Sequence, residues 1–239
     1  MVDALTRLDV VRPGRGTAMS KLAAALLSFN GGFVDTAGFI GLQGLFTAHV
    51  TGNFVTLGAA LVFGSYGFVG KLLALPEFIA VVALARLAGA ALQARGWGSL
   101  RSLLVAETVL LFAFLALAVG LGPFPDSDAP AALLTGFAGV AAMAIQNAVQ
   151  RVHLASIPPT TLMTGNTTQA VLDAVDVLRG GEPAQAAAVR GRLVRTLAAI
   201  LWFAAGCAVA AVLYLWIGFW SLAIPVVVSA VTAVLRIES

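Results

Sequence analysis

Two copies of one polar tripeptide, Thr-Gly-Asn, interrupt an otherwise apolar chain and carry the side chains best suited to binding a polar solute. The copies are Thr51, Gly52 and Asn53, and, 113 positions later, Thr164, Gly165 and Asn166. Hydroxyl and amide groups can hydrogen-bond a solute, and glycine lets backbone approach a solute closely. Each copy follows a long apolar segment and a linker. The sequence therefore predicts two helix breaks at matching places, with a site between them.

We expect each tripeptide to begin a helix inside the membrane, because Asn and Thr are preferred N-cap residues. In the second copy, Asn166 and Gln169 have the spacing of a capping box. A helix that begins there directs unpaired N–H groups and the positive end of its dipole at the site. Lipid cannot satisfy such groups, so each break must be buried in protein or line a wet cavity. The alternative is that both breaks are structural turns that only pack helices.

Charged and amide side chains inside apolar segments supply further candidates, because such groups are costly in lipid and usually functional. Asp35 and Arg86 lie within two antiparallel segments. They can form an orienting ion pair, or Asp35 can titrate while Arg86 binds an anion. Gln146 and Asn147 lie near the second break, where amides either hold helices together or contact a solute.

The remaining titratable residues have weaker assignments. His49 lies near the first break and could relay protons, whereas Glu107 is expected to reach the interface or an inner arginine. Asp173 and Asp176 share a helical face, which we expect to meet water or the basic loop 179–192. Two histidines without matched carboxylates predict no metal site, and we find no cofactor motif or nucleophile–base pair, so we expect no enzyme.

Composition assigns the chain to the helical membrane proteins. It is 60% hydrophobic and only 10% charged, and its mean hydropathy is +0.97, outside the range of soluble domains. The apolar runs have the length of spanning helices rather than of barrel strands. The single cysteine, Cys207, excludes a disulfide framework. The net charge of +3 is interpreted as a topology signal, not as nucleic-acid binding.

The predicted fold is all-α: a polytopic membrane helix bundle with six full spans and two short broken or re-entrant helices in an inverted two-fold repeat. A basic tail, 1–18, precedes a membrane domain, 19–239, with repeats at 19–122 and 131–236. The full spans are expected at 19–41, 76–95, 102–122, 131–154, 193–214 and 216–235, and the first short helix at 54–68.

The positive-inside rule favours six spans over eight. With six spans, nearly all arginines fall on the inner face and the acidic loop with Asp126 and Asp128 falls outside. Residues 54–68 give only about 22 Å of helix, less than the roughly 30 Å hydrocarbon core. Both termini are then cytoplasmic.

The motifs also carry a resemblance. Asn30-Gly-Gly-Phe-Val-Asp35, the first tripeptide, Gln146-Asn-Ala148 with Arg151, and Thr160-Thr-Leu-Met-Thr-Gly-Asn166 resemble the YoaK-like family of uncharacterised bacterial integral membrane proteins, the domain of unknown function 1275. The resemblance covers about residues 18–235 and implies a bacterial inner membrane protein with these shared polar positions. It implies no substrate.

Two function classes stay open at this stage. One is a transporter or channel for a small polar or anionic solute, bound between the two breaks. The other is a non-transporting structural or partner-binding membrane protein in which the breaks pack helices. The expected partners are the lipid bilayer and a small solute, without nucleic acid or cofactor, and a homo-oligomer stays open.

Overall fold

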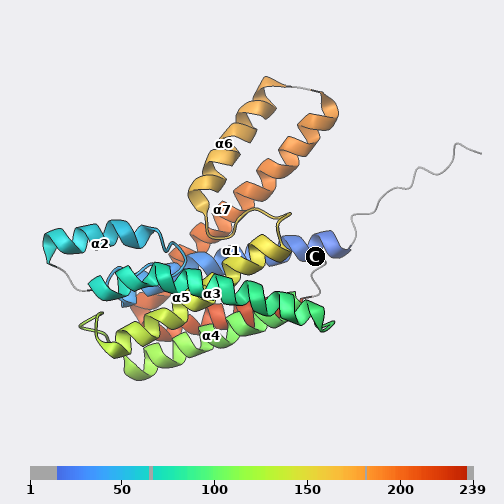
Figure 1. The fold of residues 1–239 in the computed structure, drawn as a ribbon. Helices are drawn as coiled ribbons and strands as arrows, with labels where there is room; N and C mark the ends of the chain where they lie inside the picture. Colours follow the sequence, from blue (N-terminus) through green and yellow to red (C-terminus); the bar gives the residue numbers. More distant parts are fainter. Residues whose placement is uncertain (1–14, 65–66, 181, 236–239) are drawn as a thin grey trace, which may run out of the picture.

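The computed structural model describes residues 15–64, 67–180 and 182–235. This part of the chain is all-helical and contains no strand, which confirms the predicted fold class. Figure 1 shows the helices in order. They are α1 (Arg15–Gly41), α2 (Gly52–Phe63), α3 (Phe68–Ala94), α4 (Ser99–Leu121), α5 (Pro130–His153), α6 (Met163–Arg179), α7 (Pro183–Ile217), the 3₁₀ helix η1 (Gly218–Leu222) and α8 (Ala223–Val234).

Five helical stretches of the described chain are long and apolar enough to cross a membrane. They are Met19–Gly41, Phe68–Ala94, Ser99–Leu121, Pro130–His153 and Pro183–Val234. The last stretch has 52 residues and includes both of the final predicted spans. The helices α2 and α6 have 12 and 17 residues, so both are short, as the sequence predicts.

The last apolar stretch turns back on itself at η1. The ring of Phe219 in η1 covers Gly41, at the end of α1. Ala233, near the end of α8, instead packs in one cluster with Leu27 and Leu103, near the beginnings of α1 and α4. Therefore α7 runs in the direction of α1 and α8 runs back. We call the end of the bundle at the 122–129 connection the Asp128 end, and the opposite end, at the 95–98 connection, the His153 end.

The helices α1 and α7 form the closest pair in the bundle. A Cβ atom on Gly32 would lie 2.1 Å from the Phe203 carbonyl oxygen, and one on Gly206 would lie 2.1 Å from that of Phe29. Only glycine fits at these two positions, and the lack of a side chain lets the two backbones come together. In Figure 1, α2 and the hairpin of α6 with the first half of α7 project from the bundle.

The start of α3 differs from the prediction. It begins at Phe68 rather than near Pro76, which lies inside the helix. The carboxylate of Asp128 accepts hydrogen bonds from four successive backbone N–H groups, those of residues 67–70, at 2.8–3.3 Å. This long-range cap satisfies the free amides of the first turn and fixes the start eight residues earlier than Pro76.

Two further boundaries are corrected. The predicted loop 179–192 is mostly helical, because α7 begins at Pro183, where proline suits a first turn. Residues 1–14 of the predicted basic tail 1–18 lie outside the described residues. The rest of that tail is helical, because α1 begins at Arg15.

The Arg192 guanidinium binds the Asp173 carboxylate with two nitrogens, at 2.6–3.2 Å. This pair closes the α6–α7 hairpin, so Asp173 meets the basic segment as expected.

Glu107 lies elsewhere than predicted. Its side chain is fully buried, and it contacts neither the interface nor an arginine of the described chain. It occupies the ninth position of α4, which begins at Ser99, and that part of the helix faces α8 and α1.

Candidate functional site

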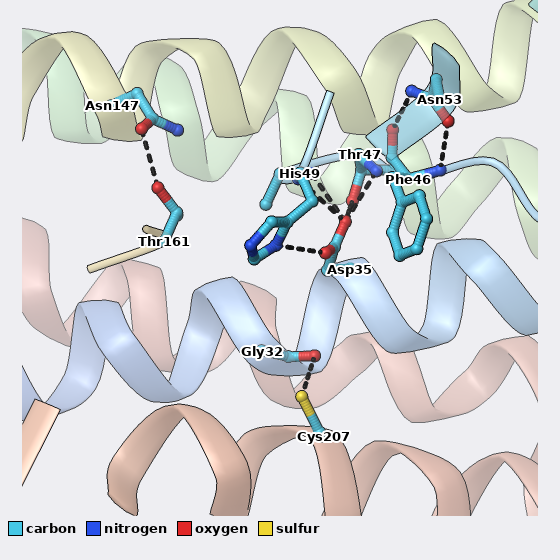
Figure 2. Close-up of polar contacts among 10 residues, drawn as sticks. Gly32, Asp35, Phe46, Thr47, His49, Asn53, Asn147, Thr161 and Cys207 are labelled. Carbon is cyan, nitrogen blue, oxygen red and sulfur yellow. Dashed lines mark hydrogen bonds and ion pairs between the residues drawn. The ribbon is translucent and has the colours of Figure 1, made fainter. Parts of the chain in front are cut away.

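The segment between α1 and α2, residues 42–51, folds back along α1 and is held by a single carboxylate. Asp35 is 5% exposed, and its Oδ1 accepts the backbone N–H groups of Thr47, Ala48 and His49 at 2.8, 2.8 and 3.3 Å. Its Oδ2 lies 3.0 Å from Nδ1 of His49. Figure 2 shows these bonds converging on the carboxylate. Asp35 is thus buried beneath the loop rather than facing a solute directly.

His49 is the ionic partner of Asp35, in place of the Arg86 considered from the sequence. The hydrogen bond that the His49 imidazole donates to Asp35 raises the pKa of His49 above its usual value, against the opposing effect of burial. The imidazole also packs between the rings of Phe46 and Phe203, with centroid distances of 6.3 and 5.8 Å. The buried Asp35 carboxylate therefore favours the protonated form of His49.

Asn53 closes the same loop from the other side. Its Nδ2 donates to the Phe46 carbonyl at 2.8 Å, and its Oδ1 accepts the Phe46 N–H at 2.9 Å. The side chain is 1% exposed. This pair of bonds imitates a backbone–backbone pair, so the amide of the first tripeptide acts on the loop and not on a solute.

The segment between α5 and α6, residues 154–162, folds back in a similar way from the His153 end. Gln146 is fully buried, and its Nε2 donates to the Leu27 carbonyl at 3.0 Å and to the Thr160 hydroxyl at 3.1 Å. Asn147 accepts the Thr161 hydroxyl at 2.8 Å, as Figure 2 shows. Both predicted amides thus anchor the second loop, and Gln146 also ties it to α1.

The first tripeptide begins α2 as predicted, with Thr51 at the N-cap position, but the predicted side-chain cap bonds are not made. The N-cap positions are Thr51 and Leu162, and neither makes a side-chain cap hydrogen bond. Asn166 lies inside α6 and donates to the Pro159 carbonyl at 2.7 Å, whereas Gln169 donates to Asp173 at 2.7 Å. Each Asn reaches seven residues back to loop backbone, because the loop passes beside the helix and offers buried carbonyls that need donors.

Between the two loops lies a pocket of about 390 Å³, which we call the central pocket. It is lined by the first loop from Ala48 to Thr51, by α3 with Phe78 and Arg86, by α5 with Asn147 and Arg151, and by Leu162 of the second loop. The pocket lies between the loops that precede the two predicted breaks, and no residue of the second tripeptide lines it. Three predicted site residues line it: Thr51, Arg86 and Asn147.

The lining of the central pocket is cationic. Arg86 and Arg151 come from facing helices, His49 comes from the loop, and no Asp or Glu is among the lining residues. Two guanidinium groups and a histidine whose pKa is raised favour a negatively charged ligand. The pocket is otherwise mostly apolar, as small-molecule sites are.

Two residues of the second tripeptide lie away from this pocket. Thr164 lines a separate groove on α6 with Thr167 and Val171, and Gly165 is exposed with open space beside its Cα. Gly52 begins α2 against the Phe46 ring, about 3.0 Å from the position of a Cβ. In the described chain, α2 and α6 do not contact each other, so it is the loops before them that approach the pocket.

Sequence reasoning gave Arg151 and His49 too little weight as lining residues. Arg151 is four positions after Asn147 and therefore lies on the same face of α5. That spacing was a usable signal. The position of His49 depends on how the first loop folds back onto Asp35, which no local pattern encodes.

Comparison with known proteins gives one match. The family model described as a protein of unknown function (DUF1275) matches residues 23–235, which confirms the resemblance drawn from the motifs. No curated protein and no solved structure matches the chain.

Proposed function

Because the chain belongs to the DUF1275 family, whose description names no activity, we propose a function from the geometry: a membrane transporter or channel for a small anionic solute. The solute binds in the central pocket, between the loops that precede α2 and α6. The observation that carries the proposal is the convergence of Arg86, Arg151 and His49 on one pocket without a lining carboxylate.

Burial of Asp35 supports this assignment. Its carboxylate, the acidic group closest in sequence to the lining loop, is engaged by three backbone amides and by His49. It therefore favours the charged form of His49 at the pocket without itself lining the pocket. The guanidinium groups of Arg86 and Arg151, on facing helices, could each donate two hydrogen bonds to a small carboxylate or oxyanion.

We propose an inner-membrane location in a bacterium, which the family resemblance implies, and the distribution of charge supports one orientation of the bundle. Arg95 and Arg101 flank the 95–98 connection at the His153 end, whereas Asp126 and Asp128 lie at the other end. By the positive-inside rule we infer that the His153 end, where α1 begins and α8 ends, faces the cytoplasm. We expect the bilayer and the solute as partners, with no enzymatic step.

The proposal is tested with purified protein in detergent, screened by thermal shift against inorganic oxyanions and small mono- and dicarboxylates. A ligand present at 100 times its Kd stabilises the folded state by about 2.7 kcal/mol. The stabilisation should be lost in Arg86→Gln and Arg151→Gln and kept in Arg95→Gln, the matched control outside the pocket. An anion that passes should then be taken up by proteoliposomes of the wild type alone. Equal stabilisation of all four proteins would exclude the central pocket as the site.

The alternative is a structural or partner-binding membrane protein, and one observation favours it. Asn53 and Asn166, the amides of the two tripeptides, both bind loop backbone. Their substitution should therefore lower stability whichever function holds, so these variants do not separate the two classes. The arginine variants do, because neither guanidinium makes an ion pair with a carboxylate in the described chain.

A further inference from the structure

The bundle contains a second polar group of residues, outside the central pocket, between α1, α4 and α8. Glu107 of α4 and Asn30 of α1 are both fully buried. Asn30 and Ser229 of α8 are the side chains close enough to act on the Glu107 carboxylate. Ser229 is also fully buried and shares a 2.8 Å hydrogen bond with Thr108.

Glu107 and Asn30 leave part of their hydrogen-bonding capacity unused. Both carboxylate oxygens of Glu107 and both polar atoms of the Asn30 amide lack a hydrogen-bond partner of standard geometry. Four unpartnered polar atoms on two neighbouring side chains, buried in a membrane bundle, are costly. Such an arrangement is retained where something else completes it.

An ionised Glu107 cannot complete it. A carboxylate only accepts hydrogen bonds, so it could pair with the NH₂ of Asn30 but would leave Oδ1 of Asn30 without a donor. It would also leave a net negative charge in the bundle, because no charged side chain of the described chain is among the groups that act on it. The side chains that act on it are Asn30 of α1 and Ser229 of α8, and neither carries a charge. The helix α5, which packs along α4, has no charged residue before Arg151.

A proton completes the group. A protonated carboxyl donates its O–H to Oδ1 of Asn30 and accepts from Nδ2 of the same amide, which pairs all four atoms and removes the charge. We propose that Glu107 and Asn30 form a proton-binding site in the membrane core, in which the carboxyl–amide pair closes when the proton is bound and opens when it leaves. This site is separate from the central pocket and does not depend on the proposed function.

The site touches the stretch of α1 that holds both loops. Asn30 lies between Leu27 and Asp35 in α1. The Leu27 carbonyl accepts a hydrogen bond from Gln146, which anchors the second loop, and Asp35 anchors the first loop. Gain or loss of the Glu107 proton makes or breaks the bond to Asn30 and therefore acts on the helix segment to which both loops are attached.

Infrared spectroscopy of the purified full chain in lipid at neutral pH tests the site. The wild type should show a carbonyl band of a protonated carboxylic acid that disappears in Glu107→Gln. The comparison is made in the Glu77→Gln background, because Glu77 of α3 also has a buried oxygen without a partner. The band should persist in Glu182→Gln, a control at the exposed start of α7. In Asn30→Ala it should shift to higher frequency, because the carbonyl loses its donor, and a purely structural glutamate would show no such link.

A second measurement uses the wild type alone, in case Glu107→Gln does not fold. The same band should vanish on alkaline titration and return on acidification, at an unchanged sodium and potassium concentration. An unchanged spectrum between the wild type and Glu107→Gln would overturn the proposal. Loss of the band on addition of sodium or potassium at constant pH would overturn it as well, in favour of a metal cation.

Discussion

The two loops beside the central pocket are held against the bundle by different kinds of side chain. Both fold back along the helix that precedes them, and both are closed by an Asn that reaches seven residues back. The first loop, residues 42–51, is anchored by the charge of Asp35. The second, residues 154–162, is anchored by the neutral amides of Gln146 and Asn147.

The difference follows from what each loop offers. The first loop presents three backbone N–H groups toward α1, and a carboxylate is the acceptor best suited to several amides at once. The second loop contains Pro158 and Pro159, which have no N–H, and it presents threonine hydroxyls to amides instead. A loop with many donors thus requires an anion, and only that loop gains a titratable partner, His49.

Removal of the anchors should give the largest contrast. Asp35→Ala leaves three amides of residues 47–49 without their acceptor, at about 1–3 kcal/mol for each buried group. We expect a loss of about 3–5 kcal/mol in the free energy of unfolding. Asn147→Ala, the matched change at the second loop, removes one neutral bond to Thr161 and one to the Met143 carbonyl within α5. It should cost about 1–2 kcal/mol. Unfolding in mixed micelles with a denaturing detergent measures both, and equal costs would remove the distinction between the loops.

The two closing asparagines should differ by a smaller amount. Asn53→Ala removes two hydrogen bonds to Phe46, and Asn166→Ala removes one to Pro159. We expect losses of about 2–3 and about 1 kcal/mol, respectively. The same unfolding assay applies, with Gly165→Ala as a control, because no atom lies within 4 Å of the added methyl group. A larger cost for Asn166→Ala than for Asn53→Ala would contradict the bond pattern.

The first loop alone should be sensitive to pH through His49. Because Asp35 raises the pKa of His49 in the folded state, the pair stabilises the protein below about pH 6.5, the unfolded value. This contribution is lost as the pH rises from there through the raised pKa. The thermal unfolding temperature of the wild type should fall over that interval relative to His49→Gln. Parallel profiles for the two proteins would show that His49 holds no additional proton.

The smallest effect should come from making the loops alike. Pro159→Ala supplies an N–H at the position equivalent to Phe46, which Oδ1 of Asn166 could then accept. The new bond, about 1 kcal/mol, is offset by the larger entropy of the unfolded chain, so stability should change by less than about 0.5 kcal/mol. A double-mutant cycle gives the sharper result: Asn166→Ala should cost more in the Pro159→Ala background than alone. Additive costs would show that no second bond forms.

Much of the architecture could be predicted from the sequence, because membrane spans are encoded in the length of apolar runs. The short α2 and α6 and the long α4 and α5 follow directly from such runs. The start of α3 could not be predicted, since it depends on Asp128, some 60 residues away. The six-span count and the repeat boundaries stay predictions.

The site was predictable only in part. Arg86 and Asn147 were predicted because a polar group inside an apolar helix is costly in lipid and is usually functional. The caps proposed for Asn53 and Asn166 were wrong because a local rule was applied where loop carbonyls, placed by tertiary packing, compete for the same amide. Identical tripeptides also suggested identical surroundings, yet Thr51 lines the central pocket and Thr164 lies on the open face of α6.

The unbroken helix α7 has a mechanical consequence. It continues without interruption from Arg192, which closes the projecting hairpin, to Gly206, where its backbone touches α1. The 14 residue steps from Arg192 to Gly206 form a continuous helical segment of about 21 Å that extends from the contact with α1 to the hairpin. A tilt of α7 by about 5° at the Gly206 contact would displace the hairpin by about 2 Å, because displacement scales with that length. A force on α6 would therefore act on the segment of α1 that carries Asn30 and Asp35.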